Sequence, residues 1–443
     1  MDQNNEVKDQ DIQNSNAEGQ VVENNEFNFV SDNLNINFET TPIVDVVNSI
    51  LVVATKKGAS DIHFDPAKDF LKVRFRIDGV LKTYVQVPNN VKQNLTARIK
   101  ILSGMNITET RLPQDGAIKT TIDGLKLDMR VSTLPTKKGE KIVIRIMDYS
   151  MSFHGIESLC FSENNYQKVI KMTNLPSGII LVTGATGSGK STTVYSILSK
   201  LNNEATNVIT VEDPVEMEIE GINQIQVNSE IGLDFATVLR SILRQDPNVI
   251  MIGEIRDSET ARIAVRASIT GHLVLSTIHT NSSLSTIERL LDMDVERYLL
   301  ASALEGVISQ KLARKLCEHC KKMCPTTDFE KKLFKKVLGL DINAIYHAVG
   351  CEHCLDGYHG RVAIHEVLSI NQEVRDAISN NVSKKELRKL VYSSGTQTIA
   401  QDGLYKILAG FTTMDEILKL IELDDVIALA NEQEMDRKKE TLS

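Results

Sequence analysis

The residues best suited to chemistry lie in the segment ILVTGATGSGKSTT, which holds the pattern GxxxxGK[ST]. Glycines let a loop wrap so that backbone N–H groups face phosphate oxygens, and the following helix adds its positive end. The lysine reaches the β- and γ-phosphates, and the hydroxyl after it ligates Mg²⁺. An ordinary glycine-rich turn is the alternative, but an apolar strand before and a helix after favour a nucleotide site. Its predicted residues are Gly184, Ala185, Thr186, Gly187, Ser188, Gly189, Lys190, Ser191 and Thr192.

Carboxylates end the next two apolar segments. Glu254 follows NVIMIG, and Glu212 and Asp213 end NVITVED. A carboxylate at the carboxyl end of a strand beside the phosphate-loop strand lies where a γ-phosphate is bound. Hydrolysis requires a metal ion and a positioned water, so we predict Glu254 as the general base, with Glu212 next. A solvated acid or a helix cap is the alternative for each. His272 and His279 flank a further strand, and each alone is more often structural than a γ-phosphate sensor.

Four of the six cysteines form two CxxC pairs, Cys317 with Cys320 and Cys351 with Cys354. Each pair places two sulfurs on one tetrahedral ion, and four such ligands close the coordination shell. In a cytosolic chain this pairing favours a metal over disulfides. We predict a structural Zn²⁺ without catalysis, and unligated surface cysteines are the alternative.

The elements that must position these residues alternate along the chain. Short apolar strands such as GIILVTG and HLVLSTIHT are separated by helical segments such as KSTTVYSILSKLN. This alternation predicts an α/β fold with a parallel sheet covered on both faces. From about Glu288 we expect mostly helix, interrupted by the cysteine segment.

The upstream part has a different pattern. Helical spacing begins at Pro42, and alternating strands turn at Asp78-Gly79 and Asp123-Gly124, which are hairpin signals. The first residues are rich in Asn, Gln, Asp and Glu and lack hydrophobic periodicity, as in disordered tails. The predicted limits are a disordered acidic tail at 1–40, an α+β domain at 41–148, a linker at 149–163, and an ATPase-type domain at 164–443 with the zinc module at about 313–360 and a helical C-terminal part.

Composition limits the classes of function. Residues 1–40 carry nine acids and one base, which is −8 of the net charge of −9, so the rest is nearly neutral. Nucleic-acid-binding domains normally carry a basic excess, so we expect no direct nucleic-acid partner. No apolar run reaches the roughly 18–20 residues of a membrane span, and the polar, acidic start is unlike a secretory signal. We predict a cytoplasmic protein, and peripheral association with a membrane complex stays open.

Several motifs together resemble a known family. GATGSGKSTT, VEDPVE, LRQDPNVIMIGEIRDSETA and GHLVLSTIHTN are similar, in order and spacing, to the Walker A, Asp box, Walker B and His box of the secretion ATPase superfamily. Upstream, ASDIHFDP, VRFRIDGVL, RLPQDG and MRVSTLPTKKGEKIVIRI resemble its N-terminal domain. The CxxC pairs and GYHGRVAIHEVL resemble the PilB and GspE branch, which powers type IV pilus assembly and type II secretion. The resemblance covers about residues 41–430.

This resemblance implies a RecA-like core and assigns roles to individual residues. Lys190 and Ser191 hold phosphate and Mg²⁺, Glu254 activates water, and Glu212 lies in the Asp box. His279 then faces the nucleotide, although the residues alone favour a structural role for it. The resemblance also assigns ATP phosphate contacts to two arginine pairs that the residues alone would leave as solvated charges: Arg130 with Arg145, and Arg240 with Arg244, the second pair at i,i+4 on one helix face.

The resemblance implies ATP, Mg²⁺ and Zn²⁺ as cofactors and a homohexameric ring as the working form. Its partner is an inner-membrane platform protein, so the ring works at the cytoplasmic face of that membrane. Three other functions stay open. The first is a pilus retraction ATPase, although the retraction branch of the resembled family lacks the two-CxxC module. The second is a nucleic-acid translocase, which fits poorly with a near-neutral body and 5% aromatic residues. The third is a non-hydrolysing regulatory ring, which fits poorly with intact Lys190, Ser191 and Glu254.

Overall fold

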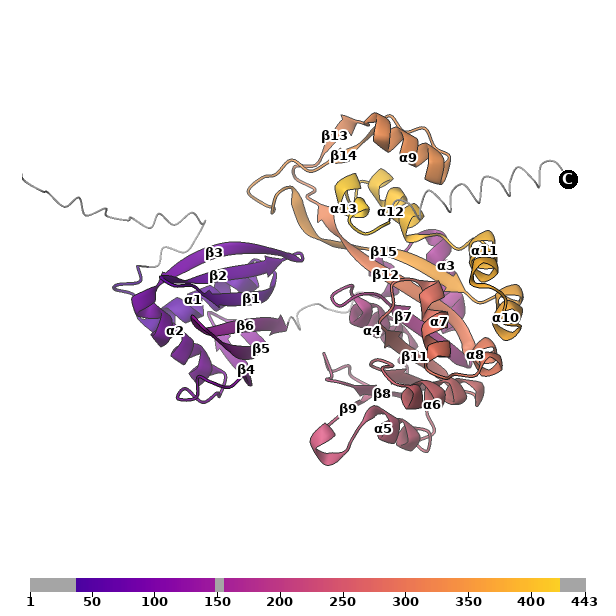
Figure 1. Ribbon diagram of the computed structural model, residues 1–443, viewed down its shortest axis with the longest axis horizontal. Coiled ribbons are helices and arrows are strands. Elements are labelled where there is room, and N and C mark those ends of the chain that lie inside the picture. Colours follow the sequence, from indigo (N-terminus) through magenta and orange to yellow (C-terminus); the bar gives the residue numbers. More distant parts are fainter. Residues whose placement is uncertain (1–36, 148–154, 423–443) are drawn as a thin grey trace, which may run out of the picture. The chain divides into compact units, whose positions relative to one another are not determined.

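Two large sheets and a small two-stranded one organise the chain in the computed structural model, which describes residues 37–147 and 155–422 (Figure 1). The two large sheets belong to different units, the first of which ends at Met147. The predicted acidic tail lies outside the described residues as far as residue 36, and the predicted linker does so from 149 to 154. In the described part, no helix is long and apolar enough to cross a membrane.

The first unit is a six-stranded antiparallel sheet in the order β3-β2-β1-β6-β5-β4, with two helices. Its elements are α1 (Ile43–Lys56), β1 (Ala59–Pro66), β2 (Phe70–Ile77), β3 (Val80–Pro88), α2 (Asn89–Leu102), β4 (Gln114–Ile122), β5 (Leu125–Thr136) and β6 (Gly139–Met147).

Two of its hairpins turn at the predicted Asp-Gly pairs. Asp78 and Gly79 have φ of 49° and 83°, and Asp123 and Gly124 have φ of 51° and 78°. Two successive positive φ angles are characteristic of the tight turn that matches the twist of paired strands, and Asp-Gly adopts them at low cost. These turns fix the register of β2 with β3 and of β4 with β5.

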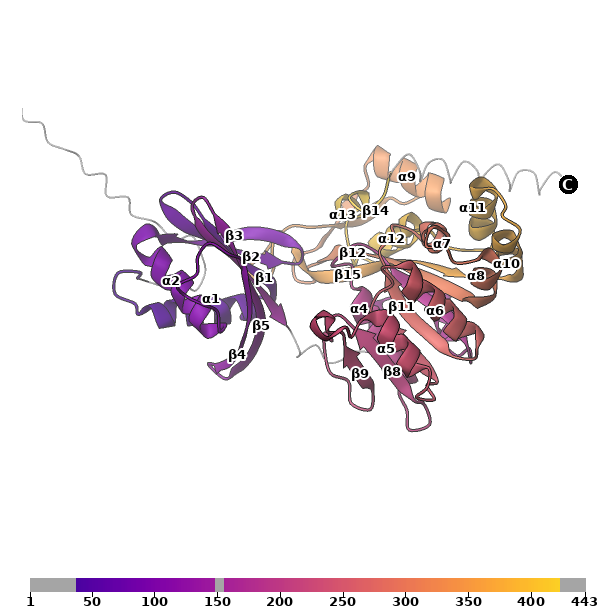
Figure 2. The ribbon, with the colours of Figure 1, turned by 60° about the horizontal axis from the view of Figure 1, so that its bottom comes forward.

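Helices cover one face of this sheet. The helices α1 and α2 lie along that face (Figure 2). Alternate strand residues such as Ile62, Phe64, Val73 and Phe75 form a buried core with them. Since successive strand residues point to opposite faces, the residues between them lie on the other face. That polar face carries ten charged residues of the four central strands: Asp61, Asp65, Lys72, Arg74, Arg76, Lys126, Asp128, Arg130, Lys141 and Arg145.

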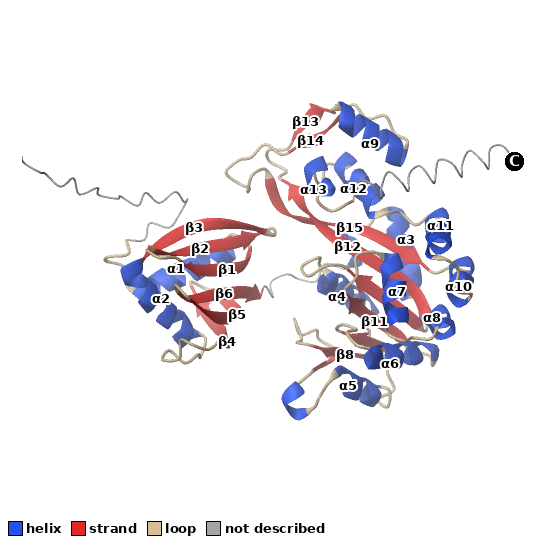
Figure 3. Cartoon of the chain, viewed as in Figure 1, coloured by secondary structure: helices blue, strands red, loops and turns tan. Residues whose placement is uncertain are grey.

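The second unit alternates strands and helices as far as β11 and then adds a long hairpin and further helices (Figure 3). Its elements are η1 (Ile156–Leu159), α3 (Glu163–Thr173), β7 (Gly178–Thr183), α4 (Lys190–Leu201), β8 (Val208–Glu212), β9 (Asn223–Gln226), η2 (Ser229–Ile231), α5 (Phe235–Ile242), β10 (Val249–Ile252), α6 (Ser258–Ile269), β11 (Leu273–Ile278), α7 (Ser283–Asp292), α8 (Arg297–Ala303), β12 (Leu304–Leu316), β13 (Lys322–Pro325), α9 (Asp328–Leu338), β14 (Ala344–His347), β15 (Tyr358–Ser369), α10 (Gln372–Ser379), α11 (Lys384–Ser393), α12 (Ile399–Leu408) and α13 (Met414–Leu418).

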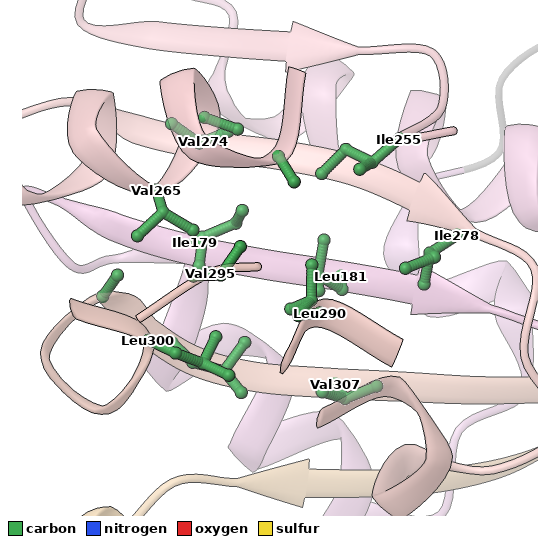
Figure 4. Close-up of a cluster of buried hydrophobic side chains, with 14 of the residues drawn as sticks. Ile179, Leu181, Ile255, Val265, Val274, Ile278, Leu290, Val295, Leu300 and Val307 are labelled. Atoms are coloured by element: carbon green, nitrogen blue, oxygen red, sulfur yellow. The ribbon is translucent and has the colours of Figure 1, made fainter. Parts of the chain in front are cut away.

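Seven strands form the sheet of this unit in the order β15-β12-β7-β11-β10-β8-β9, and every pair except β12 with β15 is parallel. Both faces are buried. Ile179 and Leu181 of β7 pack with helices α5, α6, α7 and α8 on one face (Figure 4). Ile180 and Val182 pack with α3 and α4 on the other. Each such side chain contributes about 1.5–3 kcal/mol when fully buried, so these strands hold the sheet's carboxyl edge firmly.

The segment after Glu288 departs from the expected pattern. We expected mostly helix there, but β12 and β15 are strands of 13 and 12 residues that pair with each other. The short strands β13 and β14 and the helix α9 lie between them in sequence, and further helices follow from α10. The reason is tertiary: β12 also pairs with β7, so its backbone bonds are made by a neighbouring strand that lies far away in sequence.

Candidate functional site

The predicted phosphate loop, residues 184–191, connects β7 to α4 and is called the P-loop below. Gly184, Gly187 and Gly189 have φ of 150°, 78° and 87°, which favours glycine at these positions. A Cβ at Gly184 would also lie 2.4 Å from the backbone oxygen of Gln310, and a Cβ at Gly189 would lie 2.7 Å from its Nε2. The loop therefore needs glycine for both its backbone angles and its close packing on β12.

The helix that follows the P-loop begins without a capping side chain. In the described part of the second unit, every other helix of eight or more residues starts with a side chain that accepts a backbone N–H. At α4 the cap position is Gly189, which has no such group. Ser188 Oγ is buried in the loop without a hydrogen-bond partner. Uncapped N–H groups at a helix start form an anion site, so the loop fits a nucleotide phosphate.

Lys190 at this helix start is held toward the strand ends. Its Nζ donates to the backbone oxygens of Gly184 at 2.9 Å and Ala185 at 3.1 Å. Burial lowers the pKa of Lys190, and the nearby charge of Glu254 opposes that shift. The ammonium thus lies over the loop, where it can contact a bound phosphate, while Ser191 beside it is exposed and free to ligate Mg²⁺.

His279 connects Lys190 to Glu254. Its Nδ1 lies 3.5 Å from Lys190 Nζ, and its Nε2 lies 3.2 Å from Glu254 Oε2. A neutral imidazole satisfies both contacts, because Nδ1 then accepts from the ammonium and Nε2 donates to the carboxylate. The three residues come from α4, from the end of β11 and from the end of β10, so the strand-end position predicted for Glu254 and His279 is where the structure places them.

Arg256 is a residue that the sequence analysis missed. Its guanidinium pairs with Glu254, and its Nη1 lies 3.3 Å from Asp213 Oδ2. The side chain of Glu254 is only 15% exposed, so it lies between a guanidinium and an imidazole rather than in bulk solvent. Arg256 lies two residues after Glu254 in the sequence, but nothing in the sequence indicates that its side chain points back toward Glu254.

Glu212 occupies a different setting from Glu254. Its buried carboxylate accepts from Thr210 Oγ1 at 2.6 Å, from Gln224 Nε2 at 3.1 Å and from the hydroxyl of Tyr195. Burial and this carboxylate raise the pKa of Tyr195 far above its usual range, so the hydroxyl stays protonated as a donor. Glu212 therefore ties β8 to the helix after the P-loop, and three donors already occupy it.

Gln310 is the second residue that the sequence analysis missed. This buried side chain of β12 donates from Nε2 to the Ser188 backbone oxygen at 2.7 Å and accepts from Thr193 Oγ1 at 2.6 Å. Gln310 therefore joins the P-loop and the start of α4 to the neighbouring strand β12. A single amide within the apolar run EGVISQKLA was the available signal, but we had expected this segment to be helical.

The two predicted arginine pairs have different surroundings. Arg130 of β5 and Arg145 of β6 lie directly opposite each other on the polar face of the first unit. Arg240 lies in α5 and pairs with Glu259 of α6. Arg244 follows the end of α5 rather than lying within it, which corrects the expectation of one helix face, and its Nη1 donates to the Arg240 backbone oxygen at 2.8 Å. In the described part of the chain, these contacts do not bring the second pair to the P-loop.

The four cysteines of the CxxC pairs meet at the end of the β12–β15 hairpin where the connecting segment leaves β12 and enters β15. Their sulfur atoms all lie within 4.8 Å of one another, with Cys317–Cys351 at 3.8 Å and Cys320–Cys354 at 3.7 Å. A tetrahedral ion with bonds of about 2.3 Å requires sulfur separations of about 3.8 Å. Backbone N–H groups of Gly350 and Cys351 donate to two of the sulfurs, as suits thiolates. The cluster could therefore hold a metal ion in a shell with no open position.

A parallel sheet with this P-loop at its carboxyl edge defines the class of P-loop ATPases, and the chain is one of them. The model of the family "Type II/IV secretion system protein" matches residues 37–419, and the chain belongs to that family. It is 46% identical over 380 residues to a putative type II secretion system protein E of Escherichia coli, covering 86% of this chain and 77% of that one. It is 44% identical over 374 residues to the type IV pilus assembly ATPase PilB of Thermus thermophilus, covering 84% and 42%.

Solved structures agree on the fold. The pilus retraction motor PilT with bound ADP is similar with a TM-score of 0.57 and 26% identity, over 84% of this chain and 96% of that one. The ATPase DotB of Legionella pneumophila has a TM-score of 0.64 at 23% identity, over 86% and 96%, which shows the fold alone. The predicted class, a RecA-like α/β core with a smaller α+β domain and a tetracysteine module, is confirmed.

Proposed function

We propose that this ATPase is the motor for pilin assembly in type IV pilus extension or for pseudopilus assembly in type II secretion. The arrangement of Lys190, His279 and Glu254 at the P-loop carries the proposal, because it supplies a phosphate contact, a link to the strand end and a base within one connected set. The relatives described above include proteins of both systems. The tetracysteine cluster favours assembly over retraction, since the resembled retraction branch lacks it.

In this proposal each site residue keeps its predicted role. Lys190 and the P-loop N–H groups bind the β- and γ-phosphates of ATP, Ser191 ligates Mg²⁺, and Glu254 takes a proton from the attacking water. Arg130, Arg145, Arg240 and Arg244 contact ATP phosphates in a homohexamer, with some of these contacts made across subunits. The ring acts on an inner-membrane platform protein at the cytoplasmic face of the membrane, without a membrane span of its own among the described helices.

A steady-state ATPase assay on the full chain, with and without single-stranded DNA, tests the enzyme part. We expect turnover that Lys190→Ala abolishes and that DNA leaves unchanged. Stimulation by DNA would favour a translocase, and nucleotide binding without turnover would favour a regulatory ring.

A cellular assay tests the motor part. Replacing the native copy with Glu254→Gln is expected to abolish surface filaments or secretion of folded proteins. Filaments that form normally but no longer retract would identify the alternative, a retraction motor.

We further propose that the tetracysteine cluster holds one structural Zn²⁺ per chain through Cys317, Cys320, Cys351 and Cys354. Bound zinc contributes folding free energy directly, and here it would hold the ends of β12 and β15 together with the segment between them. Cys317→Ser is expected to lower the zinc content from about one per chain to near zero and to lower the thermal stability of the second unit. Cys324→Ser, outside the cluster, is the matched control. Elemental analysis that finds no zinc in active protein would exclude the proposal.

A further inference from the structure

Four charged residues form one continuous row across the polar face of the first unit. Arg76 of β2 lies directly opposite Asp61 of β1, Asp61 lies opposite Arg145 of β6, and Arg145 lies opposite Arg130 of β5. Directly opposed side chains on one face are about 4.5–5.5 Å apart at Cβ. The row therefore carries three guanidinium groups and one carboxylate side by side, with a net charge of +2.

Asp61 is the buried member of this row. Its side chain is 10% exposed, whereas that of Arg145 is 64% exposed. Asp61 Oδ1 lies 3.1 Å from Arg145 Nε, and Oδ2 lies 3.5 Å from Arg76 Nε and accepts from Ser60 Oγ at 2.9 Å. Arg76 is itself fixed, because its Nη1 donates to the Gly79 backbone oxygen at 2.9 Å. The carboxylate is thus anchored on one side and contacts Arg145 on the other.

The contact at Nε has a consequence for Arg145. A guanidinium that is bound along its Nε edge leaves its outer Nη donors for a second acceptor, and those donors suit the paired oxygens of a phosphate. Holding the long side chain in one geometry also removes rotamer freedom, which an arginine would otherwise lose on binding. An exposed arginine fixed this way is prepared for an anion.

We propose that Asp61 is a positioning residue for Arg145, which it holds beside Arg130 so that both present guanidinium groups to a nucleotide polyphosphate. Arg76 fixes Asp61 from the opposite side and does not itself reach the phosphate. This inference rests on the proposed role of Arg145 as a phosphate contact. Asp61 does not touch the nucleotide, and its loss acts through the position of Arg145 alone.

Asp65 provides a matched comparison on the same strand and face. It lies four residues further along β1 and also pairs with two cations, Arg74 at 2.7 Å and Lys141. Its side chain is 24% exposed. Neither of its partners is opposite Arg130 or Arg145, so removing its charge costs a similar pair of ion contacts without releasing Arg145.

The experiment compares kcat and the KM for ATP in the full chain for Asp61→Asn, Asp65→Asn, Arg145→Ala and the double variant Asp61→Asn/Arg145→Ala. A misplacement of about 1 Å costs roughly 10²-fold in rate, so we expect kcat of Asp61→Asn to fall by about that factor with KM little changed. Asp65→Asn should keep the parent rate. Since Asp61 acts only through Arg145, the double variant should be no slower than Arg145→Ala alone.

Two further readouts separate positioning from folding. Loss of structure would reduce the amount of nucleotide bound per chain and the urea midpoint, and it would leave kcat per bound nucleotide unchanged.

If Asp61→Asn does not fold, Asp61→Glu keeps the charge but moves the guanidinium by one methylene, and it should lower kcat more than Asp65→Glu does. Equal kcat for Asp61→Asn and the parent, with a slow Arg145→Ala, would overturn this inference alone. A parent rate for Arg145→Ala would instead overturn the proposed role of the arginines.

Discussion

The two large sheets of this protein present their functional side chains in different ways. In the antiparallel sheet, α1 and α2 cover one face only, so charged residues such as Arg130 and Arg145 lie along the strands on the other face. In the parallel sheet, helices bury both faces, and the exposed or partly exposed polar groups of the site, Glu254 and His279, lie just after the strands end. The number of covered faces therefore decides whether a sheet offers a surface or an edge for chemistry.

This difference also sets the surroundings of each group. Arg145 on the open face is 64% exposed and is held by one buried carboxylate. Glu254 at the covered sheet's edge is 15% exposed and lies between a guanidinium and an imidazole. We expect substitutions on the open face to change catalysis with little cost to folding. Substitutions around the covered edge should affect either chemistry or stability, depending on how deeply the group is buried.

The largest effect is expected at the open face. A cation on the developing phosphoryl charge is worth about 10³–10⁵-fold in rate, so Arg130→Ala should lower kcat by that order while the urea midpoint stays near the parent value. Arg74→Ala, on the same face but paired with Asp65, is the control. If Arg130→Ala hydrolysed ATP at the parent rate, Arg130 would be a surface charge without a role in catalysis.

At the covered edge, Glu254→Gln tests the base. The amide cannot accept a proton from water, and loss of a general base costs about 10²–10⁴-fold. ATP binding, measured by fluorescence titration, should persist while turnover is lost. Glu288→Gln removes an exposed carboxylate that pairs with Lys384 and should leave turnover unchanged. Near-normal turnover of Glu254→Gln would show that Glu254 is not the general base.

The buried group at the same edge should affect stability rather than chemistry. Tyr195→Phe removes one donor from the buried Glu212 carboxylate, and an unsatisfied buried acceptor costs about 1–3 kcal/mol. Tyr166→Phe is the matched control, because Tyr166 donates to Glu157 at 3.1 Å in an exposed position. Urea unfolding measures both, and equal midpoints for the two variants would show that Glu212 does not depend on this bond.

The smallest effect concerns the stability of the protein at low pH. Burial opposes ionisation of Asp65, but hydrogen bonds from Lys141 and Arg74 outweigh it and lower the pKa of Asp65 below 3.8. A lowered folded pKa gives stability that is present above the unfolded value and is lost as pH falls through the folded value. Asp65→Asn lacks this contribution, so it should lose less stability than the parent between about pH 5 and about pH 3. The difference should be about 1 kcal/mol or less, since the pair is partly exposed. If the free energy of unfolding fell equally with pH in the parent and in Asp65→Asn, the prediction would be wrong.

The sequence by itself determined the elements that depend on local rules. The glycines and lysine of the P-loop, the Asp-Gly turns at 78–79 and 123–124, and the apolar strands before Glu254 and His279 all follow from backbone preference and hydrophobic pattern. The class of ATPase and its family were predicted from these motifs and are confirmed.

Only the tertiary structure decided what depends on partners far away in sequence. The segment around β12 is a strand because β7 and β15 supply its hydrogen bonds, and its Gln310 supports the P-loop for the same reason. The contact of Arg256 with Glu254 and the Asp61 link to Arg145 likewise depend on how side chains turn once strands are in place. Residues 84 positions apart, as Asp61 and Arg145 are, become neighbours through sheet pairing alone, and no local pattern encodes that pairing.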